Sequence, residues 1–287
     1  MCKLNGENIL QIKHASLALR GLTYRETVKF FHQKGRLLSA FVRPSLWLFV
    51  FAAGVGSVTG VDPGLNHPYP IQNVNYFEYI IPGLIGMVLL FSGMQSSLSM
   101  VYDREMGVMR LLLTAPLPRW YLLTAKLLSG TFLSVLQAYV FLIICVPIIN
   151  LMVNFSTPII GWLYILPATI LFGMMLGALG LLISVYIKQL ENFAGTMNFV
   201  IFPMFFISSA LYPLWRLKDN GAEFVWWIAN INPFTYGVEL VRWASLGQVY
   251  IPGLIVTLIC TILFLSFATI GYDPQKGMRK NGGGKPS

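Results

Sequence analysis

The chain has 287 residues, of which 56% are hydrophobic and only 11% are charged, and its mean hydropathy is +0.67. Soluble domains carry about 25% charged residues, so this composition excludes an ordinary soluble domain and indicates a protein that crosses a membrane several times. A formal net charge of +9 is more typical of basic cytoplasmic loops in a membrane protein than of nucleic-acid binding, so we expect no nucleic-acid partner.

The first 43 residues form a basic arm that holds eight of the 20 Lys and Arg residues. Thr23 and Glu26 have the spacing of a capping box, which predicts that a helix begins at Thr23. Two interpretations are open: an amphipathic helix in the headgroup plane with membrane lipids as its partners, or a disordered arm that is helical only near the membrane. We expect the interfacial helix.

Six apolar runs follow, and each is long enough to cross about 30 Å of hydrocarbon as a helix. The predicted spans are 44–60, 79–101, 121–150, 162–187, 192–214 and 250–272. The sequence therefore predicts an all-α membrane protein. We expect three parts: a cytoplasmic arm at 1–43, a transmembrane domain at 44–272 and a cytoplasmic tail at 273–287.

The basic residues are distributed unevenly between the two sides of these spans. Seventeen of the 20 lie in the arm, the 102–126 loop, the 188–193 turn or the tail, whereas the loops at 61–78 and 151–161 contain none. Because cytoplasmic loops are the ones enriched in Lys and Arg, we expect both termini to be cytoplasmic. In a bacterium, the protein would be a multi-pass protein of the plasma membrane.

The loop at 102–126 is the most charged segment between two apolar runs. We expect a short cytoplasmic helix over 103–114, ended by two prolines, that offers a binding surface to a separate partner protein. Arg110 has no acidic residue at a spacing that allows an intrahelical pair, so it suits docking into a partner; contact with lipid phosphate or solvent is the alternative. Gly107 would allow close approach. The candidate coupling residues are Asp103, Arg104, Glu105, Gly107, Arg110, Thr114, Pro116 and Pro118.

The segment at 215–249 is too long for a turn and too apolar for an ordinary loop. Asn232 and Pro233 predict a break between two helical pieces, and Glu239 and Arg242 can pair at i, i+3 spacing. The segment is either an external re-entrant hairpin that dips back into the protein or an amphipathic hairpin lying flat on the outer leaflet.

Few polar residues lie within the spans. Gln95, Gln137 and Asn198 are expected to form hydrogen bonds between helices more than to contact a substrate.

No metal site is expected, because the three histidines lie outside the spans. The spans contain no Asp or Glu, which argues against an ion-coupled carrier. The tail lacks a complete Walker A motif, so we expect no catalysis by this chain.

Three blocks of the chain, in this order, resemble the permease subunits of ABC-2-type exporters. They are FVRPSLW at 41–47, the Glu- and Arg-containing segment at 105–119, and LYP at 211–213 with INPFTYGVELVR at 231–242. The resemblance implies six spans, a second permease subunit, most simply a second copy of this chain, and a separate ABC-type ATPase. It also implies that the ATPase, and not this chain, binds ATP and Mg²⁺. The alternative is an ATP-independent membrane protein, either a secondary carrier or a scaffold of an envelope assembly.

Overall fold

The computed structural model of the chain describes residues 17, 20–21, 23–28, 32, 42–50, 76–107, 119–152, 161–187, 189–219 and 221–272. These residues form helices and turns, and no strand is found among them. The all-α prediction is therefore confirmed for this part of the chain.

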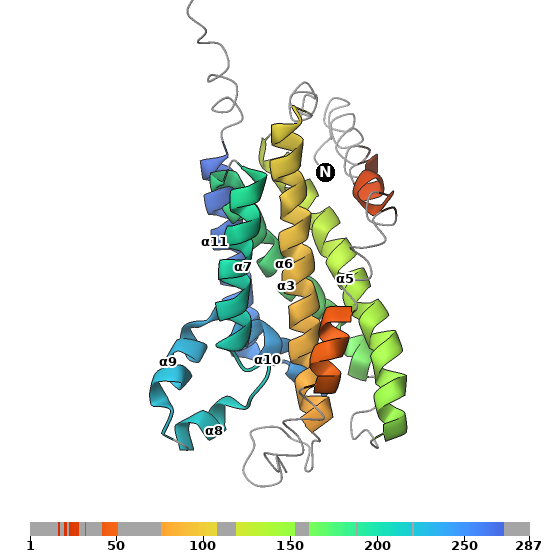
Figure 1. Cartoon of the computed structure of the whole chain (residues 1–287), viewed down its shortest axis with the longest axis vertical. Coiled ribbons are helices and arrows are strands. Elements are labelled where there is room, and N and C mark those ends of the chain that lie inside the picture. Colours follow the sequence, from red (N-terminus) through yellow and green to blue (C-terminus); the bar gives the residue numbers. More distant parts are fainter. Residues whose placement is uncertain are drawn as a thin grey trace, which may run out of the picture.

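Across the described ranges of the chain, the bounds of eight helices are defined, and Figure 1 labels these helices. They are α3 (Tyr76–Glu105), α5 (Arg119–Met152), α6 (Gly161–Tyr186), α7 (Leu190–Phe206), α8 (Leu214–Asp219), α9 (Glu223–Ile231), α10 (Pro233–Ser245) and α11 (Ile251–Gly271). Within the described residues, α3, α5, α6 and α11 are long and apolar enough to cross a membrane. These four correspond to four of the six predicted spans.

The other two predicted spans differ from α3, α5, α6 and α11. The first is predicted at 44–60; the structure shows helix at 42–50, and residues 51–60 fall outside the described residues. The predicted end of the fifth at residue 214 is wrong, because α7 ends at Phe206 and the chain turns before α8 begins. The Ser208 hydroxyl accepts a hydrogen bond from the amide of Ala210, which favours a turn over a continuing helix.

Helical backbone is present in the N-terminal arm ahead of the residue at which the capping box predicted the helix start. Residues 17, 20 and 21 are helical, as are residues 23–28. Leu17 and Arg20 are residue types with good helix propensity, which favours helical backbone ahead of the capping pattern.

Helix α6 lies in the middle of the bundle and contacts α3, α5, α10 and α11 (Figure 1). The crossing with α3 is close, because a Cβ added to Gly93 would lie 3.2 Å from the backbone nitrogen of Gly177. A Cβ added to Gly180 would lie 2.5 Å from the Ser97 hydroxyl. Small residues of α6 thus serve packing between helices of the same chain.

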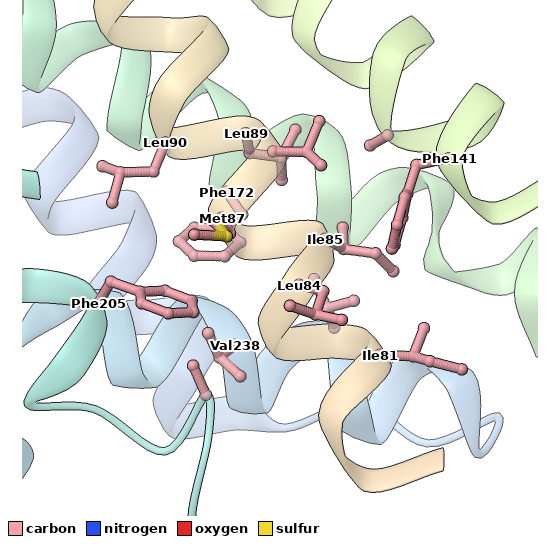
Figure 2. Close-up of a cluster of buried hydrophobic side chains, with 14 of the residues drawn as sticks. Ile81, Leu84, Ile85, Met87, Leu89, Leu90, Phe141, Phe172, Phe205 and Val238 are labelled. Carbon is pink, nitrogen blue, oxygen red and sulfur yellow. The ribbon is translucent and has the colours of Figure 1, made fainter. Parts of the chain in front are cut away.

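The core around Phe172 of α6 joins this helix to α3, α5, α7 and α10 (Figure 2). The ring of Phe172 lies 5.2 Å from that of Phe234 in α10, and Phe205 of α7 packs on Phe234 at 6.1 Å between ring centroids. Leu84 of α3 and Val238 of α10 are fully buried in the same cluster. Helix α10 is therefore part of the bundle core, although it is only 13 residues long.

Candidate functional site

The ends of α3 and α5 share a buried group of charges, which we call the α3–α5 charge cluster and which consists of Arg25, Glu26, Asp103 and Lys126. The Asp103 carboxylate accepts hydrogen bonds from Lys126 Nζ at 2.7 Å and from an Arg25 guanidinium nitrogen at 2.8 Å. Arg25 also pairs with Glu26 at 2.8 Å. Asp103 is 1% exposed and Lys126 is 5% exposed, so these charges are held inside the protein.

The α3–α5 charge cluster is electrically balanced, with two cations and two carboxylates. Burial alone lowers the pKa of the Arg25 guanidinium, but hydrogen bonds to Glu26 and Asp103 outweigh burial and raise this pKa above its ordinary value. Removing one member of such a group leaves an uncompensated buried charge, which typically costs about 3–5 kcal/mol. Asp103 therefore joins the helical arm, α3 and α5.

The two residues after Asp103 reach a different part of the chain. Arg104 donates a hydrogen bond to the carbonyl of Ile187, just after α6, at 3.5 Å. The amide of Leu190, the first residue of α7, donates to the Glu105 carboxylate at 2.9 Å. A carboxylate at a helix N-terminus satisfies a free amide and favours the helix dipole. Consecutive side chains of α3 thus hold α5, the end of α6 and the start of α7.

The prediction of a single helix over 103–114 is wrong, because α3 ends at Glu105. The amide of Gly107 bonds the carbonyl of Arg104 at 3.3 Å, and Gly107 has a φ of 72°, in the left-handed region that terminates helices. The sequence identified Gly107, but only its backbone conformation gives this reason for a glycine. Arg110, Thr114, Pro116 and Pro118 lie outside the described residues.

Replacing Gly107 with alanine should destabilise the chain by about 1 kcal/mol, because a side chain disfavours positive φ. A Cβ at this position meets nothing within 4 Å, so the cost comes from the backbone alone. Gly21 is a matched control: its backbone is helical and its added Cβ also meets nothing within 4 Å. Gly21→Ala should leave the thermal unfolding midpoint unchanged or raise it. Equal midpoints for the two variants would contradict this prediction.

A second group of polar contacts lies where α10 begins, at the opposite end of α7. The Asn232 carboxamide oxygen accepts from the amide of Phe234 at 3.0 Å and caps α10, with Pro233 at the first helical position. The same carboxamide donates to the carbonyls of Met204 at 2.7 Å and Ile207 at 2.6 Å. The predicted break at Asn232 and Pro233 is confirmed, and it also fastens the end of α7.

Arg242 is buried and joins α10 to two other segments. It pairs with Glu239, as the i, i+3 spacing predicted. It also donates to the carbonyls of Ser209 at 2.8 Å and Tyr79 at 3.3 Å, and its guanidinium lies 3.9 Å from the centroid of the Tyr79 ring. Arg242 therefore connects α10 with the first turns of α3 and with the turn that follows α7.

The polar residues predicted within the spans have different surroundings. Gln137 of α5 accepts a hydrogen bond from the Ser92 hydroxyl of α3, as expected for a contact between helices. Gln95 lines a small cavity with Arg43. Asn198 is exposed on α7, and none of the described residues forms a hydrogen bond with its side chain. In the described part of the chain, no group of three or more metal-ligand side chains comes together.

Long apolar helices tied together by polar clusters at their ends define a helical integral membrane protein. A sequence profile described as ABC-2 type transporter matches residues 18–246, so this chain belongs to the ABC-2 type transporter family. The family consists of membrane permeases of ABC transporters, which are typically non-catalytic and which imply an ABC ATPase partner.

Several relatives carry transport names. The putative transport permease ycf38 of Cyanophora paradoxa is 27% identical over 210 residues, which cover 72% of this chain and 66% of the relative. The ycf38 protein of Pyropia yezoensis is 27% identical over 242 residues, 82% of this chain and 77% of the relative. The probable multidrug ABC transporter permease YbhR of Escherichia coli K12 is 26% identical over 173 residues, 59% of this chain and 44% of the relative.

Proposed function

We propose that this chain is the permease subunit of an ABC exporter, whose helices form the substrate pathway and whose separate ATPase binds ATP and Mg²⁺. The observation that carries the proposal is the set of contacts made by Asp103, Arg104 and Glu105. These three residues stand directly before the segment at 106–118 that we assign to the ATPase contact.

A force on that segment would reach several helices at once. Asp103 holds α3 to α5 through Lys126, and Glu105 holds the first amide of α7. Because a buried ion pair resists separation, α3 and α5 would move together when the ATPase closes. Glu105 would transmit the same movement to α7.

The orientation of the chain belongs to this proposal. We place the arm at 1–43 up to the start of the 42–50 helix, the segment at 106–118 and the tail at 273–287 in the cytoplasm. The 42–50 helix, including Arg43, belongs with the transmembrane domain at 44–272 between them. The distribution of basic residues supports this orientation. Helices α9 and α10 would then form the external re-entrant element, and the burial of α10 against α3, α6 and α11 favours it over a hairpin lying flat on the leaflet.

The exposed face of α7 supports a second copy of the chain. Asn198 and Phe199 are both exposed there, next to Gly195. A carboxamide facing hydrocarbon lacks hydrogen-bond partners, whereas a second copy or the substrate pathway would supply them. We therefore propose a homodimer in which the two α7 helices lie toward each other, with lipids around the remaining surface.

Replacing Arg110 with alanine should weaken recovery of the ATPase with the purified permease. Losing one partner of a buried charge pair typically costs about 2–5 kcal/mol of binding, so recovery should fall steeply. Lys285→Ala, in the tail, is the control and should change nothing. ATP hydrolysis by the complex should be measured in lipid nanodiscs beside that of the ATPase alone. Failure of any ATPase to co-purify with the unchanged chain would favour the ATP-independent carrier or scaffold.

A further inference from the structure

Arg43 lies against the middle of α3. Its guanidinium carbon is 3.8 Å from the centroid of the Phe91 ring. Phe91 stands 15 residues after Tyr76 and 14 before Glu105, which is about 21 Å of helix from either end at 1.5 Å per residue. If Tyr79 marks the outer interface, as aromatic residues at span ends do, Phe91 lies about 18 Å deep in a layer about 30 Å thick. The guanidinium is therefore at hydrocarbon depth.

The contacts of Arg43 set it apart from other arginines in the structure. Arg25 and Arg242 form ion pairs, and Arg104 bonds a backbone carbonyl. Among the residues that the structure describes, Arg43 contacts the Phe91 ring and forms no hydrogen bond or ion pair. A guanidinium carries five N–H donors and no acceptor, and a charge within a membrane normally marks a functional site.

Among the described residues, the side chains that line the cavity beside Arg43 include donors but no acid. Arg43 and Gln95 line a small cavity of about 10 Å³, which has room for about one water molecule. Most of the remaining lining is apolar and belongs to α3, including Met87 and Phe91. The acidic residues of α3 are distant: Glu78 is 13 residues before Phe91 and Asp103 is 12 after it, about 18 Å or more along the helix.

We propose that Arg43 and Gln95 bind the oxyanion of an amphiphilic substrate at the contact between the 42–50 helix and α3. The guanidinium fork matches the two oxygens of a phosphate or carboxylate, and the Gln95 amide adds a further donor. The apolar walls suit the chain attached to the headgroup. The cavity is too small for a headgroup while Arg43 covers Phe91, so the oxyanion binds as the guanidinium swings away from the ring. This inference rests on the proposed export function and assigns its substrate class.

The test uses the full chain purified in a neutral maltoside detergent, without ATPase. Dioleoyl phosphatidylglycerol, dioleoyl phosphatidylcholine or inorganic phosphate is added in increasing amounts, and the thermal unfolding midpoint is measured. We expect phosphatidylglycerol to raise the midpoint and phosphatidylcholine, with the same tails, to leave it unchanged. In Arg43→Gln the half-saturating phosphatidylglycerol concentration should rise about tenfold or more, the effect of losing one charge-assisted hydrogen bond. Arg43→Lys keeps the charge but lacks the planar guanidinium fork, so its half-saturating concentration should lie between those of the unchanged chain and Arg43→Gln.

The controls separate this site from lipid binding elsewhere. Arg216→Gln changes an arginine of α8, a helix that contacts α9 and lies apart from the 42–50 helix, and should bind phosphatidylglycerol like the unchanged chain. Gln95→Leu should also weaken phosphatidylglycerol binding, and it replaces Arg43→Gln as the test variant if Arg43→Gln does not fold. Equal half-saturation in Arg43→Gln and the unchanged chain, or equal stabilisation by both lipids, would overturn the proposal. If inorganic phosphate raised the midpoint, neither lipid did so, and Arg43→Gln abolished the phosphate effect, the oxyanion site would stand. The proposal that the substrate is an amphiphile would then be overturned. No ATPase is present in this experiment. A failure of phosphatidylglycerol to bind would therefore overturn the lipid site without bearing on the separate test of ATPase association.

Discussion

Asp103→Ala is expected to destabilise the folded chain by about 3–5 kcal/mol. The substitution leaves Lys126, which is 5% exposed, without the carboxylate that lies 2.7 Å from its ammonium group. Arg25 loses the same partner but keeps Glu26. The thermal unfolding midpoint of the purified chain in detergent should therefore fall by many degrees, and much of the variant should be lost during expression.

A paired substitution tests whether the charge, and not merely the shape, causes this loss. Asp103→Leu combined with Lys126→Met removes both buried charges, and such replacements are often neutral or stabilising. The double variant should be clearly more stable than Asp103→Ala. Glu223→Ala changes an exposed acid in the first turn of α9 and should shift the midpoint little. If Asp103→Ala is no less stable than Glu223→Ala, the α3–α5 charge cluster does not hold α3 and α5 together.

Arg242→Ala should produce the other large loss, again about 3–5 kcal/mol. Arg242 is 4% exposed, and its removal leaves Glu239 without its cation and the carbonyls of Tyr79 and Ser209 without their donor. Arg242→Lys should recover only part of the stability, because an ammonium group lacks the planar fork that reaches several acceptors. The measurement is again the unfolding midpoint.

A milder change at the same place separates stability from transport. In Glu239→Gln the guanidinium keeps its bonds to the backbone carbonyls, so the chain should stay folded and retain the ATPase. Under the proposed function, export should fall because the contact between α10 and its neighbours is altered. Wild-type stability of Arg242→Ala would contradict the first of these expectations, and wild-type export by Glu239→Gln would contradict the second.

Hydropathy was sufficient to predict α3, α5, α6 and α11, because each is one continuous apolar run of the length that a bilayer requires. The predicted bounds of these spans were less accurate than their positions. Helix α3 extends to Glu105, beyond the predicted end at 101, because a helix satisfies its own backbone hydrogen bonds and can continue into polar residues. The predicted end of α7 at residue 214 was wrong, because the apolar residues of the sequence continue through a turn that Ser208 and Asn232 stabilise.

The sequence by itself also determined the features that depend on near neighbours: the break at Asn232 and Pro233, and the pair between Glu239 and Arg242. Both are set by residues within four positions of one another. The tertiary structure alone decided that Asp103 pairs with Lys126, 23 residues away, and with Arg25, 78 residues away. It alone placed Arg43 on the middle of α3. Such contacts depend on how helices cross and on which faces meet, and no spacing pattern within one segment specifies the residue that another helix will bring beside it.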